Sequence, residues 1–185
     1  MAAGVRVDVI RRSGVARLVP GAQVARTVAR AAHAGGAPPS VSVTVVLSDD
    51  EELADLNAEH LAKSGPTDVL SFPMLPPEAF QPHAGGPARA PEATSVLLPP
   101  APPVHGRAAR THLGDIAISV ERAVEQAGEG RGGQTGDVRW SPADELRLLL
   151  THGVLHLCGW DHAEPVEEAA MRALERRLLA EEPGH

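Results

Sequence analysis

A stretch without hydrophobic periodicity divides the chain and constrains its fold more than any other feature. From about Leu75 to Arg110 the sequence is rich in proline, glycine and alanine and contains short pieces such as PP, GG and APP. This composition buries too little apolar surface to offset the loss of chain entropy. Because long structureless stretches are unusual inside compact domains, we expect one domain over 1–185 that carries a disordered surface insertion at about 75–110, with a short strand at Ser95–Leu98.

The residues on either side of the insertion predict an α+β domain. Alternating apolar positions indicate strands at residues 5–9, 41–47, 69–72 and 113–119. Helical spacing indicates helices at residues 23–33, 119–127, 141–158 and from Pro165 onward, and a further helix that follows Ser48 and carries Leu53, Leu56 and Leu61. Four short strands and several helices suggest a single small sheet that is covered by helices. Aromatic residues make up only 2% of the chain, so Val, Leu, Ile and Ala must build its core.

Helix starts are marked by short polar motifs. The run Ser48–Glu51 matches a capping box, and Ser119 is expected to cap the helix that follows it. Ser141 precedes Pro142, which is a favourable pair at a helix start. That helix is expected to end at Gly159.

Composition restricts the compartment and the partners. A single cysteine excludes a disulfide framework, and no apolar run approaches the roughly 20 residues of a membrane helix. The N-terminus has no apolar block of signal-peptide length, so we expect a cytoplasmic protein without a membrane partner. The net charge of -7 argues against binding nucleic acid by bulk charge. Residues 1–47 nevertheless hold six arginines against Asp8, which is either a local basic surface or an ordinary solvated face.

Three histidines near the end of the chain predict a metal site. His152 and His156 lie four residues apart on an expected helix, so their imidazoles share one face. Gly159 can turn the chain and return His162 to the same point. Three imidazoles leave a fourth position open for water or substrate, as in catalytic zinc sites. We therefore expect one Zn²⁺ per chain, at the end of a core helix.

The same spacing, H-x-x-x-H-x-x-G-x-x-H, occurs in metzincin proteases. Those enzymes carry a glutamate directly after the first histidine as general base. Here Gly153 occupies that position and cannot transfer a proton, which argues against proteolysis. Cys158 is expected to be a small core residue because it points away from the metal-binding face.

Three motifs resemble the YbeY family of single-strand-specific metallo-endoribonucleases. These are HGVLHLCGWDH at 152–162, PTDVLSFP at 66–73 and LGDI at 113–116, and they occur in the order found in that family. The resemblance covers about residues 41–73 and 113–180. It implies an α+β fold with a small mixed sheet, zinc at His152, His156 and His162, and action on RNA. The implied role is maturation of the 3′ end of small-subunit (16S) ribosomal RNA and ribosome quality control, with small-subunit ribosomal proteins as candidate partners.

One position departs from the family pattern. Many members have an arginine a few residues after the Leu-Asn pair, where this chain has Leu61. Lys63 is a candidate replacement for RNA contact, although it is a point charge rather than a bidentate fork. Arg26 and Arg30 on the first expected helix are further candidates for RNA binding.

The general base is not determined by the motifs. Asp115 and Asp161 are the candidates for a catalytic carboxylate. For Asp161 the competing interpretation is a carboxylate that orients a ligating imidazole, and for Asp115 it is a residue at a strand end that bonds the backbone or a histidine. Two other functions stay open: a ribosome-assembly factor with structural zinc and no catalysis, and a metalloprotease-like hydrolase.

Overall fold

The computed structural model describes residues 4–62, 64–80, 83–84, 110–130 and 140–181. The strands are β1 (Arg6–Arg11), β2 (Val41–Ser48), β3 (Val69–Pro73) and β4 (Thr111–Ser119). The α-helices are α1 (Gly21–Ala34), α2 (Asp50–Leu61), α3 (Val120–Glu129), α4 (Pro142–Leu157) and α5 (Pro165–Glu181), with a 3₁₀ turn η1 at Pro77–Ala79. The expected strand Ser95–Leu98 lies outside the described residues.

The four strands form one mixed sheet in the order β1-β2-β4-β3. β1, β2 and β4 run parallel, whereas β3 pairs with β4 in the antiparallel sense. The prediction of an α+β domain with a four-stranded mixed sheet is confirmed.

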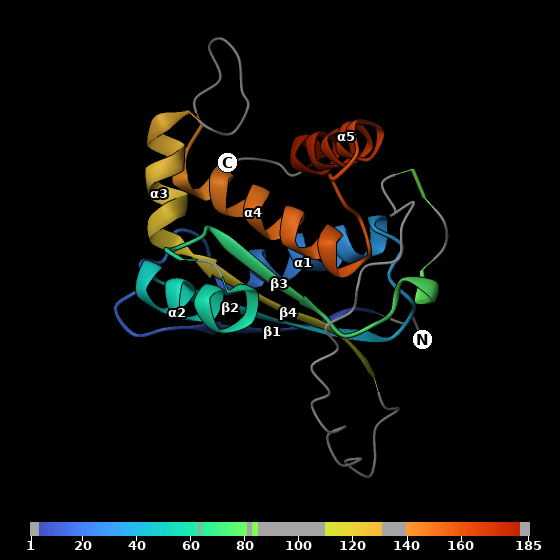
Figure 1. Ribbon diagram of the computed structural model, residues 1–185, viewed down its shortest axis with the longest axis horizontal. Coiled ribbons are helices and arrows are strands. Elements are labelled where there is room, and N and C mark those ends of the chain that lie inside the picture. Colours follow the sequence, from blue (N-terminus) through green and yellow to red (C-terminus); the bar gives the residue numbers. More distant parts are fainter. Residues whose placement is uncertain (1–3, 63, 81–82, 85–109, 131–139, 182–185) are drawn as a thin grey trace.

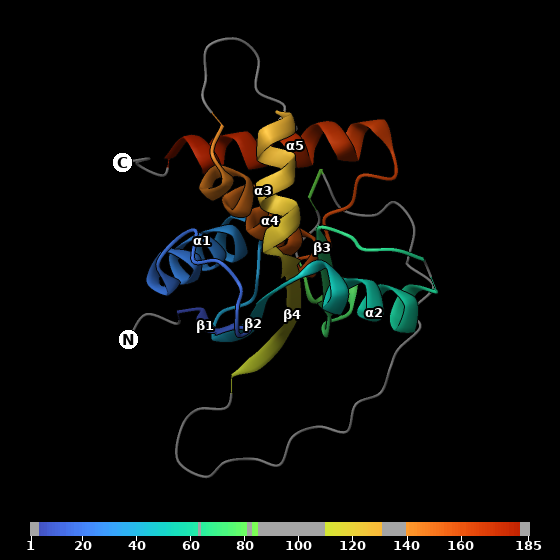
Figure 2. The same cartoon turned by 90° about the vertical axis from the view of Figure 1, so that its left-hand side faces the viewer.

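The two faces of the sheet are covered differently. Ile116 and Ile118 of β4 belong to the large core, which lies beneath α1 and α4. Ala117, between them in the sequence, points to the opposite face and packs with Leu53 of α2. Figures 1 and 2 show α1 and α4 as a layer on the sheet, with α5 lying across the outer side of α4.

Helix α4 occupies the centre of this arrangement and is buried along most of its length. Its start is a capping box: the Ser141 hydroxyl accepts from the Asp144 N–H, while the Asp144 carboxylate accepts from the Ser141 N–H. At Gly153 the helix comes so close to the sheet that a Cβ would lie 3.0 Å from Ile116 Cγ2. The glycine therefore permits close packing of α4 on β3 and β4.

The glycine of the LGDI motif has a conformational role. Gly114 has a φ of 149°, and a side chain there would overlap the carbonyl oxygen of Phe72 on β3. Only glycine tolerates both the dihedral angle and the close approach, so this motif residue serves the pairing of β3 with β4.

The other predicted caps have mixed outcomes. Ser119 caps α3 by accepting from the Arg122 N–H, as predicted. The prediction of Ser48 as the cap of α2 is wrong, because β2 continues through Ser48 and Asp49 becomes the N-cap, accepting from the Glu52 N–H.

The beginning of the expected insertion is packed. Leu75 and Phe80 lie against the large core, and the ring of His83 stacks on Trp160 with centroids 4.2 Å apart. This part of the expected insertion therefore packs on the domain, and residues 81–82 and 85–109 lie outside the described part of the chain. Among the described helices, none has the length and apolar character needed to cross a membrane.

Candidate metal centre

The three predicted histidines converge at the C-terminal end of α4. His152 and His156 lie one turn apart on the helix, and His162 follows in the loop before α5. Their ring centroids are 4.5 to 5.5 Å apart, and one nitrogen of each ring lies within 4.8 Å of the other two. The Nε2 atoms of His152 and His156 are 3.0 Å apart. This group can hold a metal ion.

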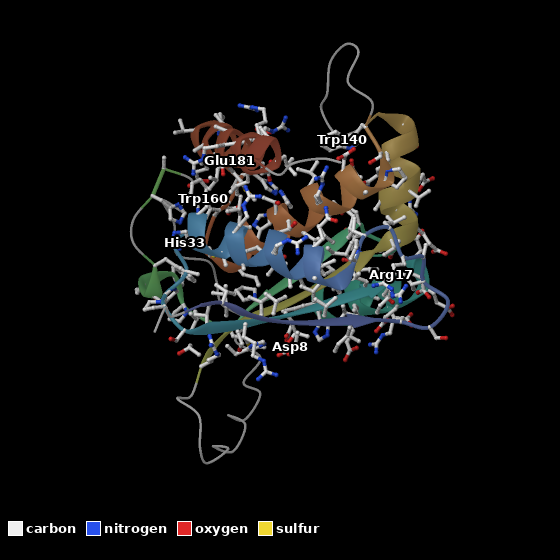
Figure 3. The ribbon with its side chains drawn as sticks, turned by 180° about the vertical axis from the view of Figure 1, so that it is seen from behind. Asp8, Arg17, His33, Trp140, Trp160 and Glu181 are labelled. Carbon is white, nitrogen blue, oxygen red and sulfur yellow. The ribbon has the colours of Figure 1, made fainter. Side chains whose placement is uncertain are left out.

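A tight turn after α4 brings His162 back to the helix. Gly159 has a φ of 79°, its N–H donates to His156 O, and the Trp160 N–H donates to Leu155 O. These paired bonds form the Schellman arrangement that commonly ends helices at glycine. The Trp160 indole donates to Gly35 O, just after the end of α1. In Figure 3 Trp160 lies beside His33 of α1. Hydrogen bonds therefore hold the turn to α4 and to the end of α1.

The chemical state of the site suits metal binding. Burial is the main cause that lowers the pKa of His156 to about 4, and repulsion from His152 and His162 contributes to the same shift. This imidazole is therefore neutral near pH 7, which is the form that binds a metal ion. Cys158 is fully buried, and burial raises the pKa of its thiol to about 12, so it is a core residue as predicted.

A carboxylate from α5 completes the surroundings of His152. Glu175 Oε1 lies 2.8 Å from His152 Nδ1, and only 10% of the Glu175 side chain is exposed. Our sequence interpretation missed this residue. The available signal was an acid on the apolar stripe of the last helix, next to Leu174 and four residues after Met171.

Comparison with known proteins places this chain in a family. The sequence profile of the family described as Endoribonuclease YbeY matches residues 20–182. The chain belongs to the YbeY family of endoribonucleases. A protein named Endoribonuclease YbeY from Mycobacterium sp. (strain KMS) is 42% identical over 147 residues, which are 80% of this chain and 67% of the relative. One of the same name from Symbiobacterium thermophilum is 38% identical over 159 residues, which are 85% of this chain and 83% of the relative.

A solved structure agrees on the fold. The solution structure of TM1509 from Thermotoga maritima matches with a TM-score of 0.51 and 20% identity, covering 95% of this chain and 86% of that protein. At this identity the match supports the α+β fold alone. The membership inferred from the three YbeY motifs is confirmed by the family profile and the curated relatives.

The two candidate catalytic carboxylates of this YbeY chain lie in different places. Asp161 is next to His162, and its Oδ1 accepts from the His162 backbone N–H at 2.7 Å. It therefore shapes the loop, and Glu175 makes the imidazole contact that we considered for Asp161. Asp115 lies on the sheet face shared with Ala117, opposite α4. Its Oδ1 is 2.8 Å from His112 Nε2, and the structure does not bring it to the three histidines.

The candidate RNA-binding residues are also separated. Arg26 is exposed on α1, whereas Arg30 donates to Leu178 O and pairs with Glu181 on α5. A local basic surface, one of our two interpretations of the N-terminal arginines, would require β1 and α1 to expose their arginines in the same direction. In Figure 3 Asp8 of β1 points away from α1, and Arg6 shares its strand face. Lys63 lies outside the described residues, and Leu61 is exposed near the end of α2.

Two further YbeY motif residues have structural roles. Asp68 accepts from the Val69 N–H and from the Gln126 amide of α3, so it fixes the start of β3. The Asn57 amide donates to Gly65 O at 2.9 Å and holds the connection between α2 and β3. Both side chains therefore shape the loop that contains the PTD sequence.

Proposed function

We propose that this chain is a zinc-dependent endoribonuclease that cleaves single-stranded RNA, with His152, His156 and His162 as the metal ligands. The observation that carries the proposal is the convergence of three imidazole nitrogens within 4.8 Å in a chain of the YbeY family. Three histidines and an open fourth position are typical of catalytic zinc rather than structural zinc.

When bound, a divalent metal lowers the pKa of a bound water and stabilises negative charge on phosphoryl oxygens. The chain supplies neutral nitrogen ligands, so the positive charge of the ion is retained for the phosphate. Asp161 is our candidate for holding a proton near the site, because it precedes the exposed ligand His162. Asp115 is the weaker candidate, because it lies on the opposite face of the sheet.

Packing at Gly153 argues against peptide cleavage of the metzincin type. The metzincin base would follow the first histidine, but here that position faces Ile116, Ser71 and Val69 inside the protein. A glutamate at this position would enter the core instead of the metal site.

The proposed substrate is ribosomal RNA of the small subunit, near its 3′ end. An unpaired strand can reach a recessed metal ion more easily than a duplex can. Arg26 is the exposed cation on α1 that we propose for RNA contact, with Arg30 as its neighbour. Small-subunit ribosomal proteins are candidate partners, and the proposed compartment is the cytoplasm, where ribosomal RNA is bound to them.

The test combines metal analysis with RNA cleavage. Purified protein should contain one zinc per chain and cleave a single-stranded RNA carrying the 3′ precursor of 16S RNA. A chelator should abolish cleavage, and added zinc should restore it. Tightly held zinc without cleavage of any RNA would favour an assembly factor, and cleavage of casein would favour a protease.

A further inference from the structure

We propose that Glu175 is a positioning residue that fixes the ring nitrogen with which His152 binds the metal. The inference rests on the proposed metal site and adds to it a residue from a different helix. Glu175 lies 23 residues after His152 in the sequence, and the packing of α5 on α4 brings the two together.

The geometry assigns one task to each nitrogen of the His152 ring. Nδ1 is 2.8 Å from Glu175 Oε1, so the proton of the neutral ring is held at Nδ1. Nε2 is 3.0 Å from His156 Nε2 and therefore lies on the side where the three rings meet. A carboxylate on the remote nitrogen selects the tautomer, orients the ring and makes the ligating nitrogen more basic.

The burial of Glu175 supports this role. Within the part of the chain that the structure describes, His152 is the only hydrogen-bond partner of its side chain. A carboxylate with little solvent contact is costly unless positive charge compensates it. An imidazole bound to a divalent cation supplies that charge, whereas a neutral imidazole does not.

The surrounding contacts keep Glu175 in place. Met171, Leu174 and Leu178 bury the same stripe of α5 in the core. Arg30 of α1 donates to Leu178 O and pairs with Glu181 at the far end of the helix. α5 is therefore a fixed support for the carboxylate.

The experiment compares Glu175→Gln with Glu168→Gln. Glu168 lies on the same helix and pairs with Arg172 on the solvent side, so it is a matched control for loss of one charge. Zinc affinity is measured by competition with a chromophoric chelator. Glu175→Gln should weaken zinc binding by about 10- to 100-fold, and Glu168→Gln should leave it unchanged.

Two readouts separate positioning from a merely structural role. In the metal-free protein, Glu175→Gln should keep or raise the thermal midpoint, because it removes a buried charge. With saturating zinc the wild-type protein should become the more stable of the two. In ¹⁵N-histidine NMR spectra of the metal-free protein, His152 should show protonated Nδ1 in the wild type and lose that single tautomer in Glu175→Ala.

Equal zinc affinity of wild type and Glu175→Gln would overturn the inference while leaving the proposed function intact. If Glu175→Gln does not fold, Glu175→Asp keeps the charge but withdraws the oxygen from Nδ1, and unchanged affinity in that variant would equally overturn it. A wild-type protein that binds no divalent metal would instead refute the proposed function.

Discussion

Two histidine–carboxylate contacts of the same length lie on opposite faces of the sheet. His152 meets Glu175 at 2.8 Å between α4 and α5, and His112 meets Asp115 at 2.8 Å on β4. The first pair is 28% and 10% exposed, whereas both members of the second are 38% exposed.

The difference lies at the other nitrogen of each ring. His112 Nδ1 is 3.2 Å from the hydroxyl of Ser42 on β2, so both nitrogens of this ring already have protein partners within the sheet. His152 Nε2 instead lies 3.0 Å from His156 Nε2, and the ring of His162 stacks beside the His152 ring. A carboxylate bound to a histidine is therefore a weak indication of a metal site. Convergence of further imidazoles on the free nitrogen is the stronger one.

The largest expected difference between the two regions appears when one histidine is removed from each. His156→Ala should strip most of the zinc, because it removes one of three ligands. The affinity loss should exceed the roughly 10- to 100-fold loss expected for changing a residue behind a ligand. His112→Ala should leave zinc content unchanged. Metal analysis after gel filtration gives both results, and full zinc occupancy in His156→Ala would refute the ligand assignment.

The second prediction concerns the close contact that places α4 on the sheet. Gly153→Ala puts a Cβ 3.0 Å from Ile116 Cγ2, so it should destabilise the fold by about 1–3 kcal/mol through overpacking. Gly128 is a matched control on α3, because a Cβ there meets nothing within 4 Å. Gly128→Ala should be neutral or stabilising by up to about 1 kcal/mol. Urea unfolding measures both variants, and equal stabilities would mean that the α4–sheet contact relaxes freely.

The third prediction tests RNA contact on the side of the sheet that α1 and α4 cover. Arg26→Ala should reduce the slope of log affinity against log salt by about 0.7 for a single-stranded RNA, because one phosphate contact is lost. Arg6→Ala, on the opposite sheet face, should leave that slope unchanged. Fluorescence anisotropy at several salt concentrations measures the slopes. An unchanged slope in Arg26→Ala would mean that RNA approaches by another surface.

The smallest effect is expected from an ion pair on the surface. A hydrogen bond from Arg12, at 2.8 Å, lowers the pKa of Glu52 below its ordinary value of 4.5. Because the folded-state pKa is the lower one, this stabilisation is complete above about pH 4.5 and is lost as the pH falls through the folded value. Glu52→Gln should therefore show a flatter loss of unfolding free energy below pH 4.5. Urea titrations at several pH values measure this, and identical acid limbs would contradict it.

The sequence predicted those parts of the fold that depend on local periodicity. Alternation in VSVTVVL, the Ser141–Pro142 start and the spacing of His152 and His156 are short-range patterns, so strands, helix α4 and two histidines on one helix face follow directly. The error at the start of α2 is a shift of one residue, from Ser48 to Asp49. The prediction of Ser48 as a cap fails because Ser48 pairs with Ser119 of β4, which extends β2 through Ser48, and these two residues are far apart in the sequence.

The sequence alone determined the three histidines and the glycine turn, because ring spacing on a helix and a positive φ at glycine are set by nearby residues. Only the tertiary structure decided which carboxylate supports them. Asp161 is adjacent to His162 yet bonds its backbone, Asp115 faces away from α4, and Glu175 reaches His152 because α5 packs across α4. Sequence distance does not determine such contacts, because burial of the apolar stripe on α5 fixes which of its faces meets the metal site.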